Sequence, residues 1–102
     1  MQQRLTKATI SPAEWEMQFN PRAATPDFEA HGAALAPYNV AAFTELNCHR
    51  DVRFGEHPLR SLDIFPAATA NAPVHVFIHG GYWRGQDKAN FAFTAGALVP
   101  LG

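Results

Sequence analysis

The sequence has little cysteine, little serine and no strong charge of one sign. Its 102 residues hold one cysteine, Cys48, so an internal disulfide is excluded. Formal net charge is -1, from 8 Lys and Arg against 9 Asp and Glu. Because no basic stripe is present, we expect neither nucleic acid nor a membrane as a partner. We interpret Cys48 as a small core residue rather than a nucleophile.

Long apolar runs are also missing. No stretch approaches the roughly 20 apolar residues that a membrane-spanning helix needs. The first ten residues, MQQRLTKATI, lack the apolar centre of a secretory signal. Hydrophobic residues make up 47% and charged residues 17%, which is typical of a globular chain. We therefore expect one domain over residues 1–102, located in the cytoplasm.

The first part of this domain, residues 1–47, is predicted to be helical. Ser11, with proline next and Glu14 three residues on, has the pattern of a capping box. Trp15 and Phe19 are four residues apart and would share one helix face.

A second helix is predicted after the break at Asn20–Pro21. It begins near Thr25 and crosses DFEAHGAALA. Pro37 interrupts this run, so YNVAAFTEL is expected to form a separate or kinked helix.

In the second part of the domain, residues 48–102, apolar and polar residues begin to alternate with a period of two, as in a β-strand. RDVRF alternates, with Val52 and Phe54 on one side, and LRSLDIF alternates with Leu62 and Ile64 on one face. The four residues GEHP lie between them, which predicts a β-hairpin.

Residues 74–78, VHVFI, are nearly continuous apolar and suit a strand buried on both faces of an α/β sheet. Asp87 can cap a last helix with Phe91, Ala95 and Leu98 on one stripe. The order of helices, hairpin, buried strand, Gly-Gly loop and helix indicates the α/β class.

The loop sequence His-Gly-Gly-Tyr-Trp after this strand has three interpretations. In the first, His75 and His79 bind a metal, but on a strand they lie about 13 Å apart, too far for one zinc ion. In the second, Gly80 and Gly81 cradle a phosphate at a helix start, but the Gly-x-Gly-x-x-Gly and Gly-Lys-Ser/Thr patterns are missing.

The third interpretation is an oxyanion hole. Acyl transfer builds negative charge on a carbonyl oxygen, and fixed backbone N–H groups stabilise that charge. Glycine suits such a loop because it accepts unusual backbone angles and lets a substrate approach. A His-Gly-Gly motif between a strand and a helix is the context in which α/β-hydrolases place one such donor.

The stretch HVFIHGGYWRGQDKANF resembles the α/β-hydrolase superfamily, specifically its arylformamidase (N-formylkynurenine formamidase)-like and esterase-like members. EWEMQFNPRAATPDFEAHGAAL resembles the N-terminal helical segment of that group, and LRSLDIFPA resembles its second strand. The resemblance implies the N-terminal part of an α/β-hydrolase fold, with an incomplete sheet. It implies hydrolysis of a small-molecule ester or aryl formamide without a metal or organic cofactor.

The resemblance also implies roles for five residues. Gly81 and Tyr82 would offer backbone N–H groups to the oxyanion. Gly80 would shape the turn, and His79 would brace the loop by hydrogen bonding. Tyr82 and Trp83 would form walls of the substrate pocket, although ordinary core packing explains these two aromatic residues equally well.

The sequence departs from the family pattern in its catalytic triad. The only serines, Ser11 and Ser61, precede the loop, and neither lies in Gly-x-Ser-x-Gly. After His79 there is no serine or histidine, and Asp87 is the one acidic residue. Since the family's nucleophile, acid and base follow the oxyanion loop, all three are absent from residues 1–102.

We therefore expect this chain to be an inactive, marginally folded N-terminal fragment of a serine hydrolase. The strand over 74–78 would lack a neighbour on one side, leaving backbone groups unpaired and apolar faces exposed. An alternative function is a non-catalytic relict or partner-binding module of the same fold, completed by a strand from a partner.

Overall fold

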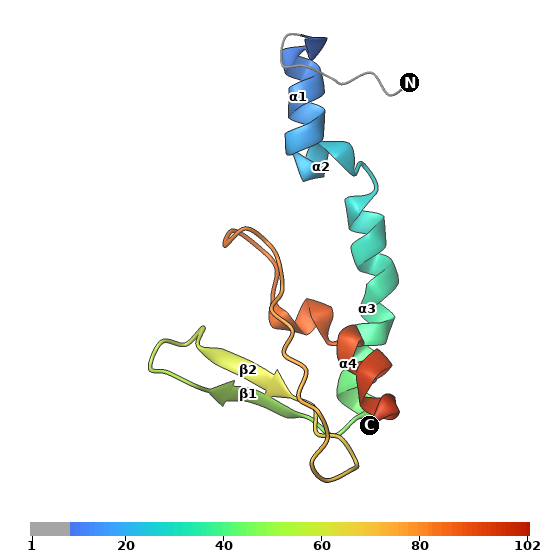
Figure 1. The fold of residues 1–102 in the computed structure, drawn as a ribbon, viewed down its shortest axis with the longest axis vertical. Coiled ribbons are helices and arrows are strands. Elements are labelled where there is room, and N and C mark those ends of the chain that lie inside the picture. The colour runs from blue at the N-terminus through green and yellow to red at the C-terminus, as the bar shows by residue number, and fades with distance from the viewer. Residues whose placement is uncertain (1–8) are drawn as a thin grey trace. The chain divides into compact units, whose positions relative to one another are not determined.

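The computed structural model describes residues 9–102, which divide into two units between His31 and Gly32 (Figure 1). Each unit is described by itself. The prediction about a secretory signal falls largely on residues 1–8, which lie outside the described residues. Within residues 9–102, no helix is long and apolar enough to cross a membrane.

In the described part of the first unit, helix α1 is Pro12–Phe19, and its start is the predicted capping box. The backbone N–H of Glu14 donates to Ser11 Oγ at 3.3 Å, and the N–H of Ser11 donates to Glu14 Oε2 at 2.7 Å. Hydrogen bonding of the Glu14 carboxylate to the backbone N–H and then to the side chain of Ser11 lowers the pKa of Glu14. The rings of Trp15 and Phe19 stack at 5.1 Å, so the predicted shared face is confirmed.

The predicted break at Asn20–Pro21 is also confirmed, because α1 ends at Phe19 and the short helix α2, Pro21–Ala24, follows. The Asn20 side chain caps α2 by accepting from the N–H of Ala23 at 3.2 Å. Asparagine is a strong N-cap residue, and proline is well tolerated at the next position.

Helix α3, Phe28–Glu45, runs through Pro37 without interruption. Of the two predicted forms, the separate helix after Pro37 is therefore wrong, and the kinked helix stays a prediction. Proline in a helix removes one hydrogen bond to the carbonyl four residues earlier, here Ala33, while the bonds on both sides continue. The surrounding alanines have high helix propensity and offset part of that loss.

The predicted hairpin is present. Strand β1, His49–Arg53, pairs antiparallel with β2, Ser61–Ile64, and Val52 lies opposite Leu62. The register shifts between His49 and Val52, so β1 carries a bulge. Asp51 in this bulge has a φ of 57°, in the left-handed region.

The hairpin loop is longer than predicted, because both strands stop short of GEHP. Residues 54–60 form the connection instead of the four residues 55–58. Within it the N–H of Arg60 donates to the carbonyl of His57 at 2.9 Å, which makes a local turn. Pro58 has no N–H to give to a ladder, which favours the turn over strand pairing.

The two faces of β2 are reversed relative to a simple amphipathic strand. Leu62 and Ile64 do share a face, as predicted, but that face is exposed. Asp63 points to the other side, and its side chain is only 6% exposed. A charged side chain is buried only when it is paired, so this inversion needs a partner for Asp63.

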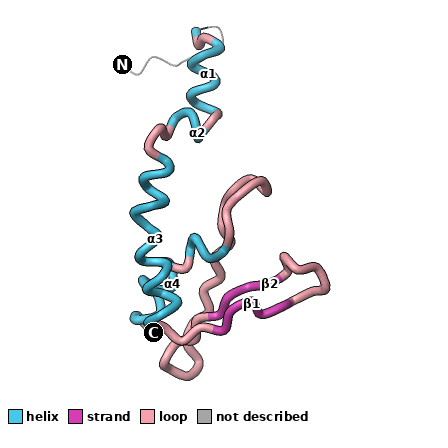
Figure 2. Tube along the Cα trace, turned by 180° about the vertical axis from the view of Figure 1, so that it is seen from behind, coloured by secondary structure: helices cyan, strands magenta, loops and turns pink. Residues whose placement is uncertain are grey.

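The predicted buried strand over residues 74–78 is not formed. The whole connection between β2 and the next helical turn is loop in Figure 2. Val74 is 89% exposed and Ile78 is 86% exposed. No strand in the described residues pairs with this segment, so no sheet there holds it, and its aliphatic side chains stay exposed.

The last helix is also divided. Asp87 caps a 3₁₀ turn, η2, Lys88–Phe91, by accepting from the N–H of Ala89 at 2.9 Å. Helix α4, Phe93–Leu98, and the 3₁₀ turn η3, Val99–Leu101, follow. The predicted cap is confirmed, but it begins a tight turn rather than one continuous helix.

The described part of the chain has a very small core. Only Ala42 and Ala92 among its residues are buried, at 3% and 5% exposure. Aromatic contacts supply the rest of the packing in the second unit. Phe43 of α3 meets Phe65 at 5.7 Å, and Arg50 lies over the Phe43 ring at 4.0 Å.

This small core predicts weak folding cooperativity. Residues 1–102 in isolation should melt over a broad temperature range, because few side chains are fully removed from water. Circular dichroism and calorimetry of the monomer would measure this. A sharp transition with equal calorimetric and van't Hoff enthalpies would contradict the expectation.

Candidate functional site

The candidate site is the loop over residues 79–87, which leaves the extended segment and returns to η2. Figure 1 shows the chain rising from the hairpin region, turning back at a tip and descending beside itself. At the tip the N–H of Arg84 donates to the carbonyl of Gly81 at 3.0 Å. The central residues of this turn, Tyr82 and Trp83, have φ of 53° and 55°.

Positive φ at both central positions is the sign of a type I′ turn. Such turns are usually made by asparagine and glycine, and bulky residues there cost of order 1–3 kcal/mol each. Tyr82 and Trp83 therefore occupy a backbone conformation that does not favour them. Strain of this kind is concentrated at binding and catalytic sites, so it is consistent with a functional loop.

Gly81 is the glycine that this loop requires. Its φ is 133°, and a Cβ at this position would lie 2.1 Å from the carbonyl oxygen of Gly85. Gly80 is different, because a Cβ there meets nothing within 4 Å. The turn is therefore shaped by Gly81, while the proposed shaping role of Gly80 has no steric basis in this conformation.

The backbone N–H groups of Gly81 and Tyr82 are the predicted oxyanion donors. Neither donates a hydrogen bond to any residue of the range 9–102. Buried N–H groups are almost always paired, so unpaired ones belong on an open surface or opposite a ligand. The loop leaves both groups available, and the oxyanion role stays a prediction.

His79 begins the loop and contacts it in two ways. Its Nδ1 lies 2.6 Å from the carbonyl oxygen of Gly80, so Nδ1–H is the donor in that tautomer. Its ring stacks on Phe91 of η2 at 5.5 Å, with 8° between the ring planes. Phe77 reaches the same Phe91 ring at 5.6 Å. These contacts attach the start of the loop to η2.

Tyr82 and Trp83 project from the tip. Trp83 is 99% exposed, and the two rings lie 5.7 Å apart at 55°. Their role as walls of a substrate pocket stays a prediction, because in this conformation both side chains are exposed to solvent. An apolar groove of about 550 Å³ lies elsewhere, between α3 and the α4–η3 segment, and includes Tyr38 and Phe93.

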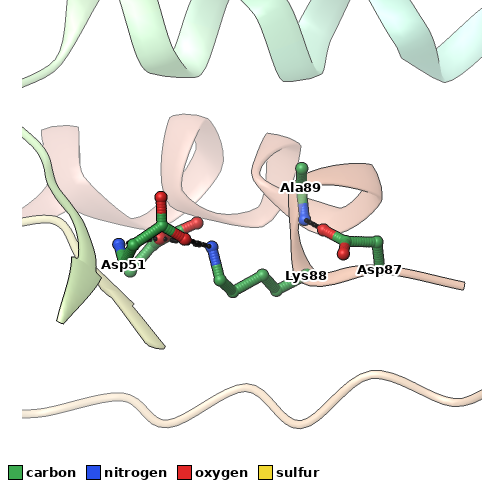
Figure 3. Close-up of polar contacts among 5 residues, drawn as sticks. Asp51, Asp87, Lys88 and Ala89 are labelled. Carbon is green, nitrogen blue, oxygen red and sulfur yellow. Dashed lines mark hydrogen bonds and ion pairs between the residues drawn. The ribbon is translucent and has the colours of Figure 1, made fainter. Parts of the chain in front are cut away.

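Lys88 is a residue of this region to which the sequence pattern assigned no role. Its Nζ lies 2.7 Å from Asp51 Oδ1 and 2.7 Å from Asp63 Oδ1 (Figure 3). Asp63 Oδ1 also accepts from the N–H of Asp51 at 2.9 Å. Lys88 is thus the partner that the inward-facing Asp63 needs.

The pKa values in this cluster follow from its geometry. Burial by itself would lower the pKa of Lys88, but hydrogen bonds to Asp51 and Asp63 outweigh it and raise the pKa above 10.5. The hydrogen bond from Lys88 lowers the pKa of Asp51 below 3.8. Lys88 and Asp51 therefore both stay charged throughout the neutral pH range.

Asn39 is the second residue that was missed. From α3, its Nδ2 donates to the carbonyl of Asn90 at 2.9 Å, and its Oδ1 accepts from the N–H of Phe93 at 2.8 Å. One amide thus satisfies the end of η2 and the start of α4. The sequence signal is a polar residue between Tyr38 and Val40 in an apolar helix.

Cys48 is free and half-buried. Burial raises the pKa of its thiol, and the negative charge of Asp63 raises it further. A raised pKa disfavours the reactive thiolate, so the interpretation of Cys48 as a structural residue is supported. Among residues 9–102, no group of three His, Cys, Asp or Glu side chains is placed to hold a metal ion.

The chain is similar to two proteins named kynurenine formamidase. The protein from Danio rerio is 30% identical over a stretch that covers 92% of this chain and 35% of that protein. The protein from Salmo salar is 27% identical over 95 residues, which cover 91% of this chain and 31% of that protein. The chain therefore spans about a third of the length of these relatives.

No protein-family model matches the chain, and no solved structure matches it. The two relatives confirm the arylformamidase-like part of the resemblance. Membership of the α/β-hydrolase superfamily stays a prediction.

The two neighbouring glycines give a matched pair for testing the loop. Gly81→Ala should open the turn, because its Cβ would overlap the Gly85 carbonyl, and should speed amide exchange of Arg84 about tenfold or more. Gly80→Ala should leave that exchange rate unchanged within about twofold. Hydrogen exchange followed by NMR measures both, and equal effects of the two variants would contradict the assigned geometry.

Asp51 gives a prediction about acid. Since its pKa is lower in the folded chain than its ordinary 3.8, its pairing contributes stability that is fully present above about pH 3.8. That contribution is lost as the pH falls through the lower folded value. An NMR titration of the Asp51 carboxyl should give a pKa below 3.8 that returns toward 3.8 in Lys88→Met. The same pKa in both chains would show that the pair does not form.

Proposed function

We propose that residues 1–102 form the N-terminal part of an α/β-hydrolase-fold serine hydrolase that cleaves an aryl formamide or a carboxylic ester. Similarity to proteins named kynurenine formamidase supports the aryl formamide class. The order of the segments supports the position within the fold, since the oxyanion loop of α/β-hydrolases precedes the nucleophile, acid and base.

The observation that carries this proposal is the free pair of amides at the loop tip. The N–H groups of Gly81 and Tyr82 donate to no residue within 9–102, and Gly81 has no side chain to block an approaching carbonyl. Donors fixed before the reaction stabilise developing charge without reorganising, and one such donor is worth roughly 3–4 kcal/mol.

In the proposed reaction, a serine outside residues 1–102 attacks the carbonyl carbon of the substrate, and its hydroxyl proton passes to the general base, which then acts as the general acid. The carbonyl electron pair moves to oxygen, and the oxyanion accepts hydrogen bonds from Gly81 and Tyr82. The C–N or C–O bond then breaks, the leaving group takes a proton from the general acid, and water releases the acyl group. This chain supplies charge stabilisation, and no metal or organic cofactor takes part.

A second candidate function is a non-catalytic module that binds a partner strand. The observation that favours it is the exposure of residues 74–78: Val76 and Ile78 are 74% and 86% exposed, and Phe77, which contacts Phe91, is still 49% exposed. An extended segment with one free apolar face can be completed by a strand from another chain. This candidate shares the fold with the first and differs in having no turnover.

Fragment complementation tests the proposed activity. Residues 1–102 alone should not hydrolyse N-formylkynurenine or a p-nitrophenyl ester and should not react with a fluorophosphonate, because the nucleophile is absent. Co-expression with the remaining two-thirds of the Danio rerio relative should restore hydrolysis. In the restored enzyme, Gly81→Ala should lower kcat about 100-fold or more.

Gly80→Ala is the matched control in the same enzyme and should change kcat by less than about threefold. Labelling of residues 1–102 alone by the fluorophosphonate would contradict the absence of an activated serine. A complemented assembly that is folded but inactive would favour the partner-binding module. Paired rates on the two substrates would separate formamidase from esterase activity.

A further inference from the structure

The turn η2, Lys88–Phe91, holds both ends of the loop over 79–87. At the start of the loop, the His79 ring stacks on Phe91. At the end, Asp87 caps the turn through the N–H of Ala89. Because both ends of the loop contact the same four residues, the place of its tip depends on how η2 is fixed within the second unit.

Two side chains fix η2 from elsewhere in the sequence. Asn39 of α3 bonds to the carbonyl of Asn90 and the N–H of Phe93. Lys88 itself reaches the hairpin, 37 residues back to Asp51 and 25 back to Asp63. The first residue of η2, directly after the loop, is therefore also the one that connects the end of the loop to β1 and β2.

The ion pair of Lys88 with Asp63 differs from an ordinary surface pair, whereas the Asp51 side chain in the other pair is 70% exposed. Exposed pairs contribute little, because water screens them and long side chains lose freedom. The Asp63 side chain is 6% exposed and the Lys88 side chain 24% exposed, so screening is reduced here. In Figure 3 the Lys88 chain lies extended toward Asp51, with dashed contacts at its nitrogen.

Removing the ammonium would leave the two carboxylates facing each other. Both touch the same nitrogen, and Asp63 would then keep only the N–H of Asp51 as a donor. Like charges at close range repel, and a buried carboxylate without its cation is strongly destabilising. The hairpin and η2 would then separate, and the loop would lose the fixed end that Lys88 supplies.

We propose that Lys88 is a positioning residue, whose ammonium holds the end of the 79–87 loop against the hairpin carboxylates and so fixes the N–H groups of Gly81 and Tyr82. It touches neither substrate nor reacting atoms. The inference rests on the proposed function for the meaning of those N–H groups. The physical coupling between Lys88 and the loop tip is measurable without any substrate.

The coupling is tested by NMR on the 102-residue chain. In Lys88→Met the amide of Arg84, which closes the tip, should exchange about tenfold faster or more, and the Gly81 and Tyr82 amide signals should shift. Lys88→Arg should keep at least half of the slow exchange that Lys88→Met loses, because arginine keeps the positive charge. Unchanged tip signals with altered hairpin signals would overturn the proposal and leave Lys88 a hairpin residue only.

Two further variants keep the test decisive. Asp51→Asn removes one exposed carboxylate and leaves Asp63 paired, so it should give a smaller shift at the tip in the same direction. This variant decides the matter if Lys88→Met fails to fold. Arg22→Met removes a cation from the exposed pair with Glu29 in the first unit and should leave the tip signals unchanged.

The complemented enzyme separates this inference from the proposed function. Lys88→Met should lower kcat at least about tenfold with KM within about twofold, since misplaced donors weaken the transition state and not substrate binding. If the complemented enzyme is inactive but Lys88→Met still changes the amide signals of the loop tip, the proposed function is contradicted and the inference about Lys88 stands. An active enzyme with a normal kcat in Lys88→Met would overturn the inference alone.

Discussion

The second unit depends on one ammonium group shared by two carboxylates. Asp63 faces inward from β2 although its neighbours Leu62 and Ile64 face outward, and Lys88 makes that inversion tolerable. The same contact joins the hairpin to the turn at which the His79 loop ends. With Asn39 holding that turn from α3, polar contacts add to the very small apolar core of residues 9–102.

The loop geometry follows from this anchorage and from one glycine. Gly81 lets the chain double back against Gly85, and the turn forces left-handed angles on Tyr82 and Trp83. Such angles persist only where surrounding contacts hold them. In this account, stacking of His79 on Phe91 and the ion pairs of Lys88 supply that restraint, and the resulting tip presents two unpaired N–H groups.

Sequence reasoning succeeded where the determining interactions are local. The Ser11 capping box and the antiparallel hairpin depend on residues close in the sequence, and both are present. The expected strand over 74–78 failed because a strand exists only with a neighbour to pair with. The contacts of Lys88 and Asn39 could not be predicted, because their partners lie 25 to 54 residues away and no hydrophobic period or motif spacing indicates such contacts.

The central claim is that Gly81 and Tyr82 bind a developing oxyanion. Its most direct measurement is a structure of residues 1–102 complemented by the rest of a relative and bound to a phosphonate transition-state analogue. The account predicts one phosphonate oxygen within about 2.7–3.1 Å of both backbone nitrogens. A phosphonate bound to the serine with its oxygens held by other donors, and with the Gly81 and Tyr82 N–H groups facing solvent, would contradict it.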